Sequence, residues 1–399
     1  MRDEEYEAYL KYQSGMEDGR RKEEERSFAR IETGGQTQRN RKKEKQNSGK
    51  GQRRRISHIR KPIMVVAAAA LLLIAMTLTL GGIIVRGLPA RHEIFPKAGE
   101  AVDPASSDYM TLALFGLDAR DGNLIEGNNR SDCMIIASIN KKTGRIRLLS
   151  LYRDTYLNTW DNVCTKANAA YARGGPQMAV SMINRNFDLN ITDYVSIGFL
   201  GLADMIDALG GLDLDLTQEE VDYANQYVHD MHLESGTALE QLEWIPETEH
   251  LTGIQAVAFC RIRYTQGDDY KRSSRQREVL SALLERVKKA GLPGWKKAFQ
   301  VFSESGFVST SLSDEDFLWL ISKAMVMEID DTKGLPDTDL RTTKIVDSQD
   351  CVIPLSLTDN AVRLHKFLYN ADNYQPSQTV ENISSRIKKD ADLSEQNGT

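Results

Sequence analysis

Carboxylates and arginines gather at the ends of a predicted β-hairpin. The segment "RSDCMIIASINKKTGRIRLLSLYRD" (130–154) predicts strands over 133–139 and 146–151, joined by a short turn that contains glycine. Because the chain goes out and comes back, Asp132 and Arg153 are expected at the same end of an antiparallel hairpin. Carboxylate oxygens bind hard divalent cations, and guanidinium groups bind phosphate oxygens. These residue types together indicate a site for a phosphorylated ligand.

A third strand extends this group of residues. "YMTLALFG" (109–116) predicts a strand, and the length of the following loop favours antiparallel pairing with 133–139. Its C-terminal end would then bring Asp118 and Arg120 to the same edge of the sheet, with Arg120 as a further phosphate ligand. For each of these residues alone, a structural ion-pair network is the alternative, because exposed pairs contribute only about 0–1 kcal/mol.

A second basic cluster follows in "FCRIRYTQGDDYKRSSRQREVL" (259–280). Arg261 and Arg263 are spaced as on one face of a strand. A helix that starts near Ser273 would place three further groups on one side: Arg272, Arg275 and Gln276. Since the N-terminus of a helix already carries positive partial charge, arginines there predict a bound anion. A solvated helix face is the alternative. Asp269 is expected to be a solvated loop residue that could also join the site.

Together the two clusters predict a diphosphate bound through a divalent cation. Asp118 and Asp132 would hold the metal, because two aspartates would otherwise repel a diphosphate. The guanidinium groups of both clusters would hold the phosphate oxygens. Neither set of residues could bind such a ligand alone.

Residues 63–85 predict a transmembrane helix. "IMVVAAAALLLIAMTLTLGGIIV" has 23 residues without a charge, about 34 Å as a helix. This length and the polar leader before it argue against a cleaved signal peptide and against a buried core helix. Residues 39–61 hold eleven basic residues and one acidic residue. The positive-inside rule therefore places the N-terminus in the cytoplasm and residues after 86 outside.

Charge divides the chain at this segment. Residues 1–61 hold 18 Lys and Arg against 11 Asp and Glu, whereas residues 86–399 hold 33 against 46. Residues 1–62 are predicted to be a disordered, basic cytoplasmic tail, because they lack the apolar side chains that a core needs. Its basic half is expected to lie on anionic lipid. Nucleic acid is not an expected partner, since the tail contains no DNA-reading module.

The outer part predicts an α/β fold, a three-layer α-β-α domain with a mixed central sheet. Strands and helices alternate, as in "YVSIGFLGLADMIDALGGLDLDL" (194–216), which predicts strand, helix, Gly-Gly stop and strand. The expected boundaries are a linker at 86–107 and a catalytic domain at 108–300. Residues 301–383 would pack on it as a C-terminal extension, and 384–399 would be a disordered tail.

A position outside the cell limits the possible substrates. No ATP supply exists there, so a group donor must be activated inside, as a lipid-linked diphosphate is. The apolar run "FLGLADMIDALGGLDL" (199–214) could line a slot for its prenyl chain, and core packing is the alternative.

Cysteine and histidine spacing predicts no metal site. The four cysteines lie on the outer side, where disulfides persist, and none has C-x-x-C spacing: Cys133, Cys164, Cys260 and Cys351. The sequence does not choose among their three possible pairings. His229 and His232 lie one helical turn apart without a third ligand nearby, and are expected to be surface residues.

Six motifs occur in an order that resembles one protein family. They are "LALFGLDAR", "NRSDCMIIASINKKTGRIRLLSLYRDTYL", "KANAAYARGG", "DALGGLDL", "LTGIQAVAFCRIR" and "GDDYKRSSRQREVL", within residues 108–290. This pattern resembles the LytR-CpsA-Psr family. The resemblance implies a magnesium- (or manganese-) dependent phosphotransferase that moves a glycan phosphate from an undecaprenyl diphosphate carrier to peptidoglycan. Teichoic acid or capsule would be the cargo. The protein would be a single-pass signal-anchor protein of the cell membrane, with its C-terminal domain outside.

The resemblance also implies roles for residues. Asp118 and Asp132 match the aspartates that hold magnesium, and Arg153 matches an arginine that contacts the diphosphate. Further diphosphate ligands are implied at Arg261, Arg263, Arg272, Arg275 and Gln276. Three residues depart from the family pattern without removing a charged ligand: Leu117, which lacks a possible hydroxyl contact, Tyr152 and Lys271. The general base stays open between Asp154 and a metal-bound water.

Two other functions stay open. A prenyl diphosphate hydrolase would use water in place of the acceptor hydroxyl. A non-catalytic lipid sensor would bind the same ligand and regulate cell-envelope genes through its basic tail.

Overall fold

The computed structural model describes residues 91–118, 124, 129–237, 239–263, 268–304 and 306–393. Among these residues, no helix is both long enough and apolar enough to cross a membrane. The tail predicted at 1–62 and the membrane span predicted at 63–85 lie outside them.

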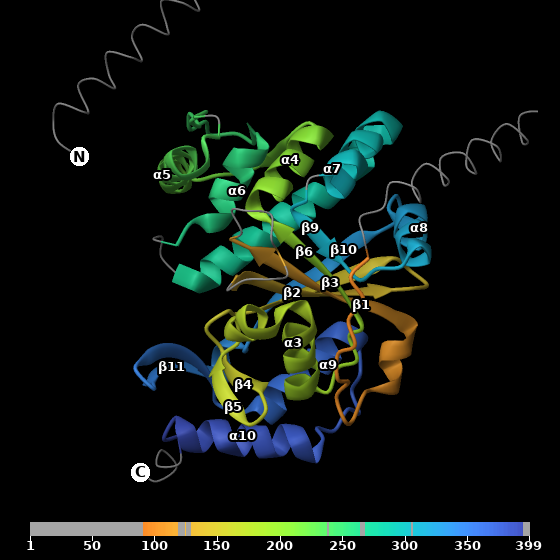
Figure 1. Ribbon diagram of the computed structural model, residues 1–399, viewed down its shortest axis with the longest axis vertical. Coiled ribbons are helices and arrows are strands. Elements are labelled where there is room, and N and C mark those ends of the chain that lie inside the picture. The colour runs from red at the N-terminus through yellow and green to blue at the C-terminus, as the bar shows by residue number, and fades with distance from the viewer. Residues whose placement is uncertain are drawn as a thin grey trace, which may run out of the picture. The chain divides into compact units, whose positions relative to one another are not determined.

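A mixed six-stranded sheet forms the centre of the domain, in the order β10-β3-β2-β1-β6-β9 (Figure 1). Its strands are β1 (Tyr109–Leu117), β2 (Ser131–Asn140), β3 (Arg145–Leu151), β6 (Asp193–Gly198), β9 (Val308–Thr310) and β10 (Glu328–Leu335). β2 pairs antiparallel with both β1 and β3, whereas β1 pairs parallel with β6 and β3 parallel with β10. The α/β class, the mixed sheet, the predicted hairpin and the antiparallel pairing of its first neighbour are confirmed.

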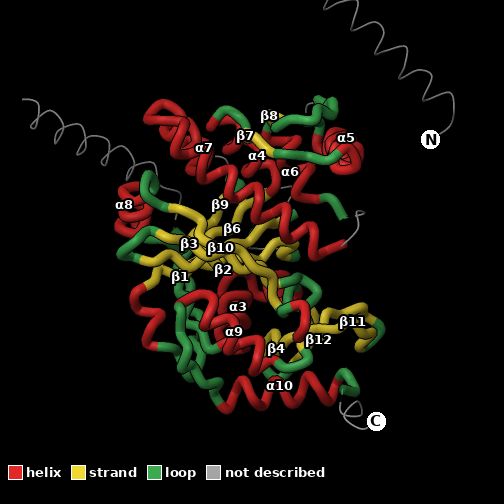
Figure 2. Tube along the Cα trace, turned by 180° about the vertical axis from the view of Figure 1, so that it is seen from behind, coloured by secondary structure: helices red, strands yellow, loops and turns green. Residues whose placement is uncertain are grey.

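Helices cover both faces of this sheet (Figures 1 and 2). One face carries α4 (Phe199–Leu209), α6 (Gly253–Arg261) and α7 (Asp268–Glu304); the other carries α3 (Ala169–Phe187), α9 (Leu357–Tyr369) and α10 (Gln378–Asp390). Side chains alternate along β1, because successive residues of a strand point to opposite faces. Phe115 and Leu117 are buried in the core on the α3 side, and Leu112 is buried in the core on the other side.

Smaller elements surround this framework. They are η1 (Pro104–Asp108), β4 (Tyr156–Trp160), β5 (Val163–Lys166), β7 (Leu212–Leu214), α5 (Gln218–Ser235), β8 (Glu249–Leu251), α8 (Asp314–Lys323), η2 (Thr338–Leu340), β11 (Arg341–Val346) and β12 (Gln349–Pro354). β4 with β5, β7 with β8, and β11 with β12 form separate two-stranded sheets. All four cysteines are free thiols in the structure.

The strand predicted for Arg261 and Arg263 is wrong, because α6 continues through Arg261. Thr252 and Gln255 form a capping box that starts this helix, and its apolar residues are buried. α7 likewise begins at Asp268, earlier than the predicted start. Spacing of i, i+2 alone does not separate a strand from the last turn of a buried helix.

The segment predicted as a C-terminal extension is integrated into the domain. It supplies β9 and β10 to the central sheet as well as helices that pack on it. The tail predicted to be disordered from residue 384 is helical through Asp390. Ile383 and Ile387 lie one turn apart on α10, and burying both in the core holds this polar segment in place.

Asp188 ties these C-terminal helices to the core. It ends α3 in a left-handed conformation, and its side chain is fully buried. Its Oδ2 accepts hydrogen bonds from the Tyr374 hydroxyl and the Ser377 backbone N–H, both at 2.7 Å. Its Oδ1 accepts from Ser377 Oγ at 2.8 Å and from Glu100 N–H at 3.2 Å. Because Ser377 is the N-cap of α10, one carboxylate joins three parts of the chain.

We predict that Asp188→Ala lowers the free energy of unfolding by about 2–4 kcal/mol, since several buried donors lose their acceptor together. Urea unfolding of the full-length chain in detergent measures this. Asp372→Ala is the control, because its ion pair with Lys366 is exposed and is expected to contribute less than about 1 kcal/mol. Equal losses in the two variants would contradict the assigned role of Asp188.

Candidate functional site

The predicted cluster lies where β3 ends and β2 begins. Arg153 follows β3, and its Nη1 donates a hydrogen bond to Asp132 Oδ1 at 2.9 Å. The hairpin therefore brings Asp132 and Arg153 together, as the sequence predicts.

A β-bulge aims Asp132 at this site. Gly116 of β1 pairs with Cys133, but Leu117 pairs with Ser131, so Asp132 is an extra residue in β2. Bulges turn a side chain away from simple alternation and are frequent beside active sites. Met134, two residues later, is buried in the core on the α3 side. Asp132 instead contacts Arg263, which follows α6 on the opposite face of the sheet.

The end of α6 presents two arginines to the two predicted metal ligands. Arg263 Nη2 donates to Asp132 Oδ2 at 3.2 Å. Arg261 Nη2 lies 4.0 Å from Asp118 Oδ2, at the end of β1. The Arg261 guanidinium also lies 5.4 Å and 5.5 Å from the ring centres of Phe199 and Tyr227, within cation–π range. Both arginines therefore point at the carboxylates at the ends of β1 and β2.

Arg153 is held by three carboxylates. Besides its bond to Asp132, its Nε lies 3.2 Å from Asp269 Oδ2 and 3.3 Å from Asp154 Oδ2. Burial alone would lower the pKa of Arg153, but the charges of these three aspartates raise it above its usual value. Lys166 Nζ lies 2.9 Å from the other oxygen of Asp154. Arg153 is thus a permanently charged group fixed at the centre of the cluster.

Arg272 is a buried guanidinium with incomplete hydrogen bonding. Arg272 is only 3% exposed to solvent. Its Nη1 lies 3.3 Å from Asp269 Oδ1, but neither Nη1 nor Nε has a hydrogen-bond partner among the residues that the structure describes. Burial, followed by the nearby charge of Arg153, lowers the pKa of Arg272. A buried donor without an acceptor costs about 1–3 kcal/mol or more, so this arrangement favours an anion as the missing partner.

Arg275, one turn further along α7, has a different environment. Its Nε donates to Glu220 Oε1 of α5 at 3.0 Å, and its Nη1 donates to the carbonyl of Ile262 at 3.2 Å. The residue is 1% exposed. Arg275 thus fixes the carbonyl of Ile262, between Arg261 and Arg263, and its direct contact with a diphosphate stays a prediction.

The structure does not test the predicted diphosphate contacts of Gln276 and Arg120. Gln276 is buried next to Arg275 in α7, and its contact with a diphosphate stays a prediction. Arg120 lies outside the residues that the structure describes.

Asp118 and Asp132 fit a divalent cation that uses few protein ligands. They stand at the same end of the adjacent strands β1 and β2. Each directly follows one member of the last pair between these strands, Leu117 with Ser131. Within the described residues, no three acidic, histidine or cysteine side chains converge as a metal site. Mg²⁺ is commonly held by one or two carboxylates, with water and substrate phosphates as its other ligands. This pair could therefore supply the protein's share of such a site.

Three more residues lie around the cluster: Asp269, Lys166 and Arg341. Asp269 joins the site from the first turn of α7, as the sequence left open. Lys166 was not singled out, although it begins one of the six motifs. Arg341 comes from β11, and its guanidinium lies 3.8 Å from the ring centre of Tyr270. Its Nη1 donates to the Tyr152 hydroxyl at 3.2 Å, which braces the residue before Arg153.

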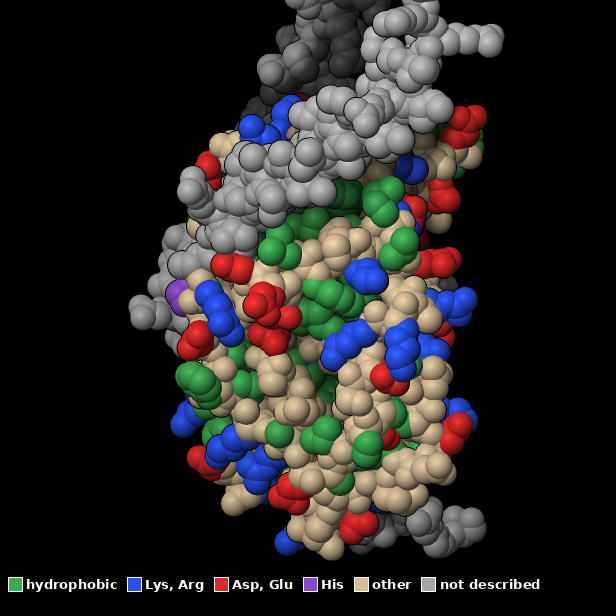
Figure 3. All heavy atoms as spheres, turned by 90° about the vertical axis from the view of Figure 1, so that its right-hand side faces the viewer, with side chains coloured by type: hydrophobic (Ala, Val, Ile, Leu, Met, Phe, Trp, Pro, Cys, Tyr) green, Lys and Arg blue, Asp and Glu red, His purple; other side chains and the backbone are tan. Residues whose placement is uncertain are grey.

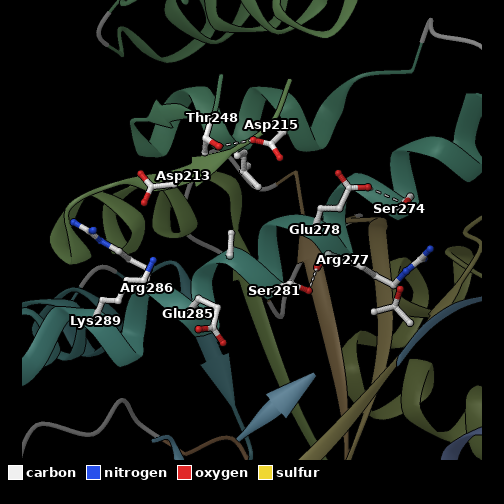
Figure 4. Close-up of a pocket in the computed structure, with 13 residues that line it drawn as sticks. Asp213, Asp215, Thr248, Ser274, Arg277, Glu278, Ser281, Glu285, Arg286 and Lys289 are labelled. Atoms are coloured by element: carbon white, nitrogen blue, oxygen red, sulfur yellow. Dashed lines mark hydrogen bonds between the residues drawn. The ribbon is translucent and has the colours of Figure 1, made fainter. Parts of the chain in front are cut away.

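A pocket of about 620 Å³ lies apart from this cluster, along α7 (Figure 4). Some of its side chains pair with one another, as with Thr248 and Asp215 at 2.6 Å and Ser274 and Glu278 at 3.0 Å. Arg277 lines one end and donates to Ser150 of β3 at 2.7 Å. Asp132, Arg153 and Arg272 do not line this pocket.

Comparison with known proteins agrees with this arrangement. Residues 90–329, more than half of the chain, match the model of the LytR_cpsA_psr family. The chain belongs to the LytR-CpsA-Psr family. The matched region contains Asp118, Asp132, Arg153, Arg263 and Arg272, whereas Arg341 of β11 lies beyond it.

Curated relatives match about half of this LytR-CpsA-Psr chain. The polyisoprenyl-teichoic acid–peptidoglycan teichoic acid transferase TagU of Bacillus cereus is 28% identical over 200 residues, 50% of this chain and 59% of the relative. Biofilm regulatory protein A of Streptococcus mutans is 34% identical over 194 residues, 46% of this chain and 45% of the relative. The matches therefore span less than two thirds of either relative.

The fold is also similar to that of a solved structure. A protein of Streptococcus agalactiae aligns with a TM-score of 0.55 and 23% identity, over 75% of this chain and 100% of the other. The likeness supports the fold of the LytR-CpsA-Psr domain.

We predict effects of different size on stability for two arginines of α7. Arg275→Met should lower the free energy of unfolding by about 3–5 kcal/mol, because it leaves the buried Glu220 carboxylate without its partner. Arg272→Met removes a buried charge that lacks full hydrogen bonding, so the change should stay below about 1 kcal/mol. Urea unfolding of both full-length variants tests this. Losses of the same size would contradict the difference drawn between the two side chains.

We also predict a pH effect that arises at Asp269. Burial would raise the pKa of this carboxyl, but the charges of Arg272 and Arg153 lower it below its usual value. A lowered pKa stabilises the fold above the unfolded pKa of about 3.9, and this contribution is lost as pH falls through the folded pKa. Between about pH 5 and 2, the stability of the wild type should therefore fall more steeply than that of Asp269→Asn.

Chemical denaturation at a series of pH values measures both curves. Asp372→Asn, at the exposed pair with Lys366, is the control and should follow the wild type. Parallel curves for wild type and Asp269→Asn would show that the two arginines do not stabilise this carboxylate.

Proposed function

We propose that this chain is a membrane-anchored phosphotransferase that moves a glycan phosphate from a polyprenyl diphosphate carrier to peptidoglycan outside the cell. One observation carries the proposal: the buried Arg272 has donors without acceptors among the described residues, beside the charges of Arg153 and Arg263. A diphosphate would supply oxygen acceptors and negative charge at this point. The name of the TagU relative supports teichoic acid as one possible cargo.

An apolar layer between the sheet and α7 suits the prenyl chain. Leu114 of β1 and Val195 of β6 are in central strands and pack against the same apolar cluster as Leu280 and Leu284 of α7, yet all four stay partly exposed. Central strand residues under a helix are usually fully buried, so apolar surface remains accessible inside this layer. The apolar run at 199–214, which the sequence offered as a slot for the prenyl chain, is less suitable. Its helix α4 buries Ile206 fully in a core cluster.

The proposed step joins the acceptor to the phosphorus that carries the glycan. The acceptor hydroxyl oxygen bonds to this phosphorus, and the bond to the bridging oxygen breaks, so prenyl phosphate leaves. Arg153, Arg263 and Arg272 would stabilise the charge that develops on the leaving group. Mg²⁺ or Mn²⁺, held by Asp118 and Asp132, would neutralise phosphate charge.

The proton of the acceptor hydroxyl has a defined destination in this scheme. Asp154 lies beside Arg153 and Lys166, and Asp269 lies beside Arg153 and Arg272. Although burial would raise the pKa of Asp269, the charges of Arg272 and Arg153 lower it and so make Asp269 a weak base. A phosphate monoester, in contrast, binds a proton with a pKa of about 6. We therefore propose that the proton passes to the departing prenyl phosphate.

The membrane arrangement is part of the proposal. Residues 63–85 would span the membrane once, with residues 1–62 as a disordered cytoplasmic tail and the α/β domain outside. The polar leader, the charge-free span and the basic residues at 39–61 support this orientation. A regulator is the second candidate function, because one relative is named Biofilm regulatory protein A.

We predict that Arg272→Met and Arg263→Ala each weaken binding of a prenyl diphosphate about 10- to 100-fold, the range for a charged hydrogen bond of about 1.5–3 kcal/mol. Titration calorimetry of the full-length chain in detergent with Mg²⁺ measures this. Arg386→Met is the control, because Arg386 lies on α10 and pairs with Asp390.

Transfer itself is measured as glycan bound to isolated peptidoglycan. Wild-type transfer by folded Asp132→Asn, or in the presence of a chelator, would contradict the metal assignment. Release of free glycan phosphate alone would indicate a hydrolase. Binding without any turnover would favour the regulator.

A further inference from the structure

The helix α8 carries apolar side chains that the domain does not bury. Five consecutive apolar residues, 317–321, lie in this helix, and each of its ten residues is partly or fully exposed. Just after the helix, Met325 and Val326 are 58% and 62% exposed. Together with exposed Leu318, they form what we call the α8 rim. Exposed apolar groups that lie together are candidates for a contact surface.

The turn of the β2–β3 hairpin lies against this rim. Glu328 N–H donates to the Gly144 carbonyl at 3.3 Å, and a Cβ at Gly144 would lie 3.1 Å from the carbonyl oxygen of Val326. Two ion pairs lie near the rim: Lys142 with Asp108 and Arg145 with Asp330. The first turn of α8 is acidic and its last turn carries Lys323. Apolar contact, and not net charge, would therefore drive any association.

The path of the chain limits the distance between the start of α8 and the end of the predicted membrane span. Arg91, where the described chain begins, donates from its Nε to the Ser311 carbonyl at 2.7 Å. The next residue, His92, donates its backbone N–H to Thr310 at 2.9 Å. α8 begins three residues after Ser311. From the end of the predicted span at Val85 to Arg91 is six residues, which reach at most about 20 Å.

We propose that the α8 rim docks on the outer leaflet of the membrane that residues 63–85 would span. Figure 3 shows the face that carries α8, where apolar side chains gather between charged ones. An interfacial element of this type buries its apolar face about 5–10 Å into the headgroup region. The inference rests on the proposed membrane span, and it does not depend on the chemical step.

Docking would also fix the distance of the diphosphate site from the membrane surface. Asp132 and Asn140 lie at opposite ends of β2, with Asn140 next to the turn. Eight residues of strand span about 26 Å. With the turn end on the bilayer, the arginine cluster would stand roughly this far out, on the side toward the cell wall.

Lipid cross-linking tests the proposal. The photoreactive amino acid p-benzoylphenylalanine is placed at position 326 of the full-length chain, which is reconstituted in vesicles of phosphatidylglycerol and phosphatidylethanolamine. Position 345 is the matched control, because Ile345 is 77% exposed and β11 lies on the other side of the domain from α8 (Figures 1 and 2). We expect at least tenfold more lipid adduct at 326 than at 345. Equal yields would overturn the proposal.

A second measurement separates docking from the proposed chemistry. The double variant Met325→Ser, Val326→Ser should lower turnover of a donor embedded in vesicles about tenfold, because two apolar side chains no longer enter the lipid. Turnover of a short-chain donor dissolved in water should stay at the wild-type rate. Unchanged turnover of both donors would overturn the proposed docking. If wild type turned over neither donor, the proposed function would fail, while the adduct ratio would still decide the docking surface.

Discussion

The architecture of the site depends on positive charge that the fold buries without complete pairing. Arg272 sits in the first turns of α7, where the helix dipole adds further positive potential, and Arg153 is close by. Asp269 offsets part of this charge, but Nε of Arg272 still finds no acceptor in the described chain. Such an arrangement is stable only because the rest of the domain holds it, and an anion would complete it.

The same contacts couple the proposed metal to the proposed diphosphate. Both oxygens of Asp132 accept from guanidinium groups, Oδ1 from Arg153 and Oδ2 from Arg263. If those arginines turn to phosphate oxygens, the Asp132 carboxylate loses its partners and becomes available to a cation. A divalent cation would in turn remove the repulsion between Asp132 and the phosphates. Each ligand would thus create the conditions for the other, as linkage requires.

Local patterns predicted the elements of this site better than its long-range contacts. The hairpin and its neighbour followed from period-two alternation, a glycine turn and a short loop. The end of α6 was missed because Arg261 and Arg263 fit a strand equally well, although the capping box at Thr252 was a readable signal. Helical spacing placed Arg275 beside Arg272, but no local pattern shows that Glu220 arrives from α5 to pair with it. Arg341 reaches the site from β11, far along the chain, for the same reason.

The two ends of the central hairpin have opposite chemical character, and the proposed lipid-linked substrate would give this difference a purpose. The turn end adjoins exposed apolar residues, whereas the other end gathers arginines and aspartates. Lifting a diphosphate from a bilayer to the charged end would expose its prenyl chain to water, at about 0.8 kcal/mol for each methylene group. An apolar path along the sheet would remove that cost. Leu114 and Val195, accessible between the sheet and α7, lie in the central strands along such a path. The sheet would then act as a spacer that keeps the chain in apolar surroundings while its phosphates reach the wall side.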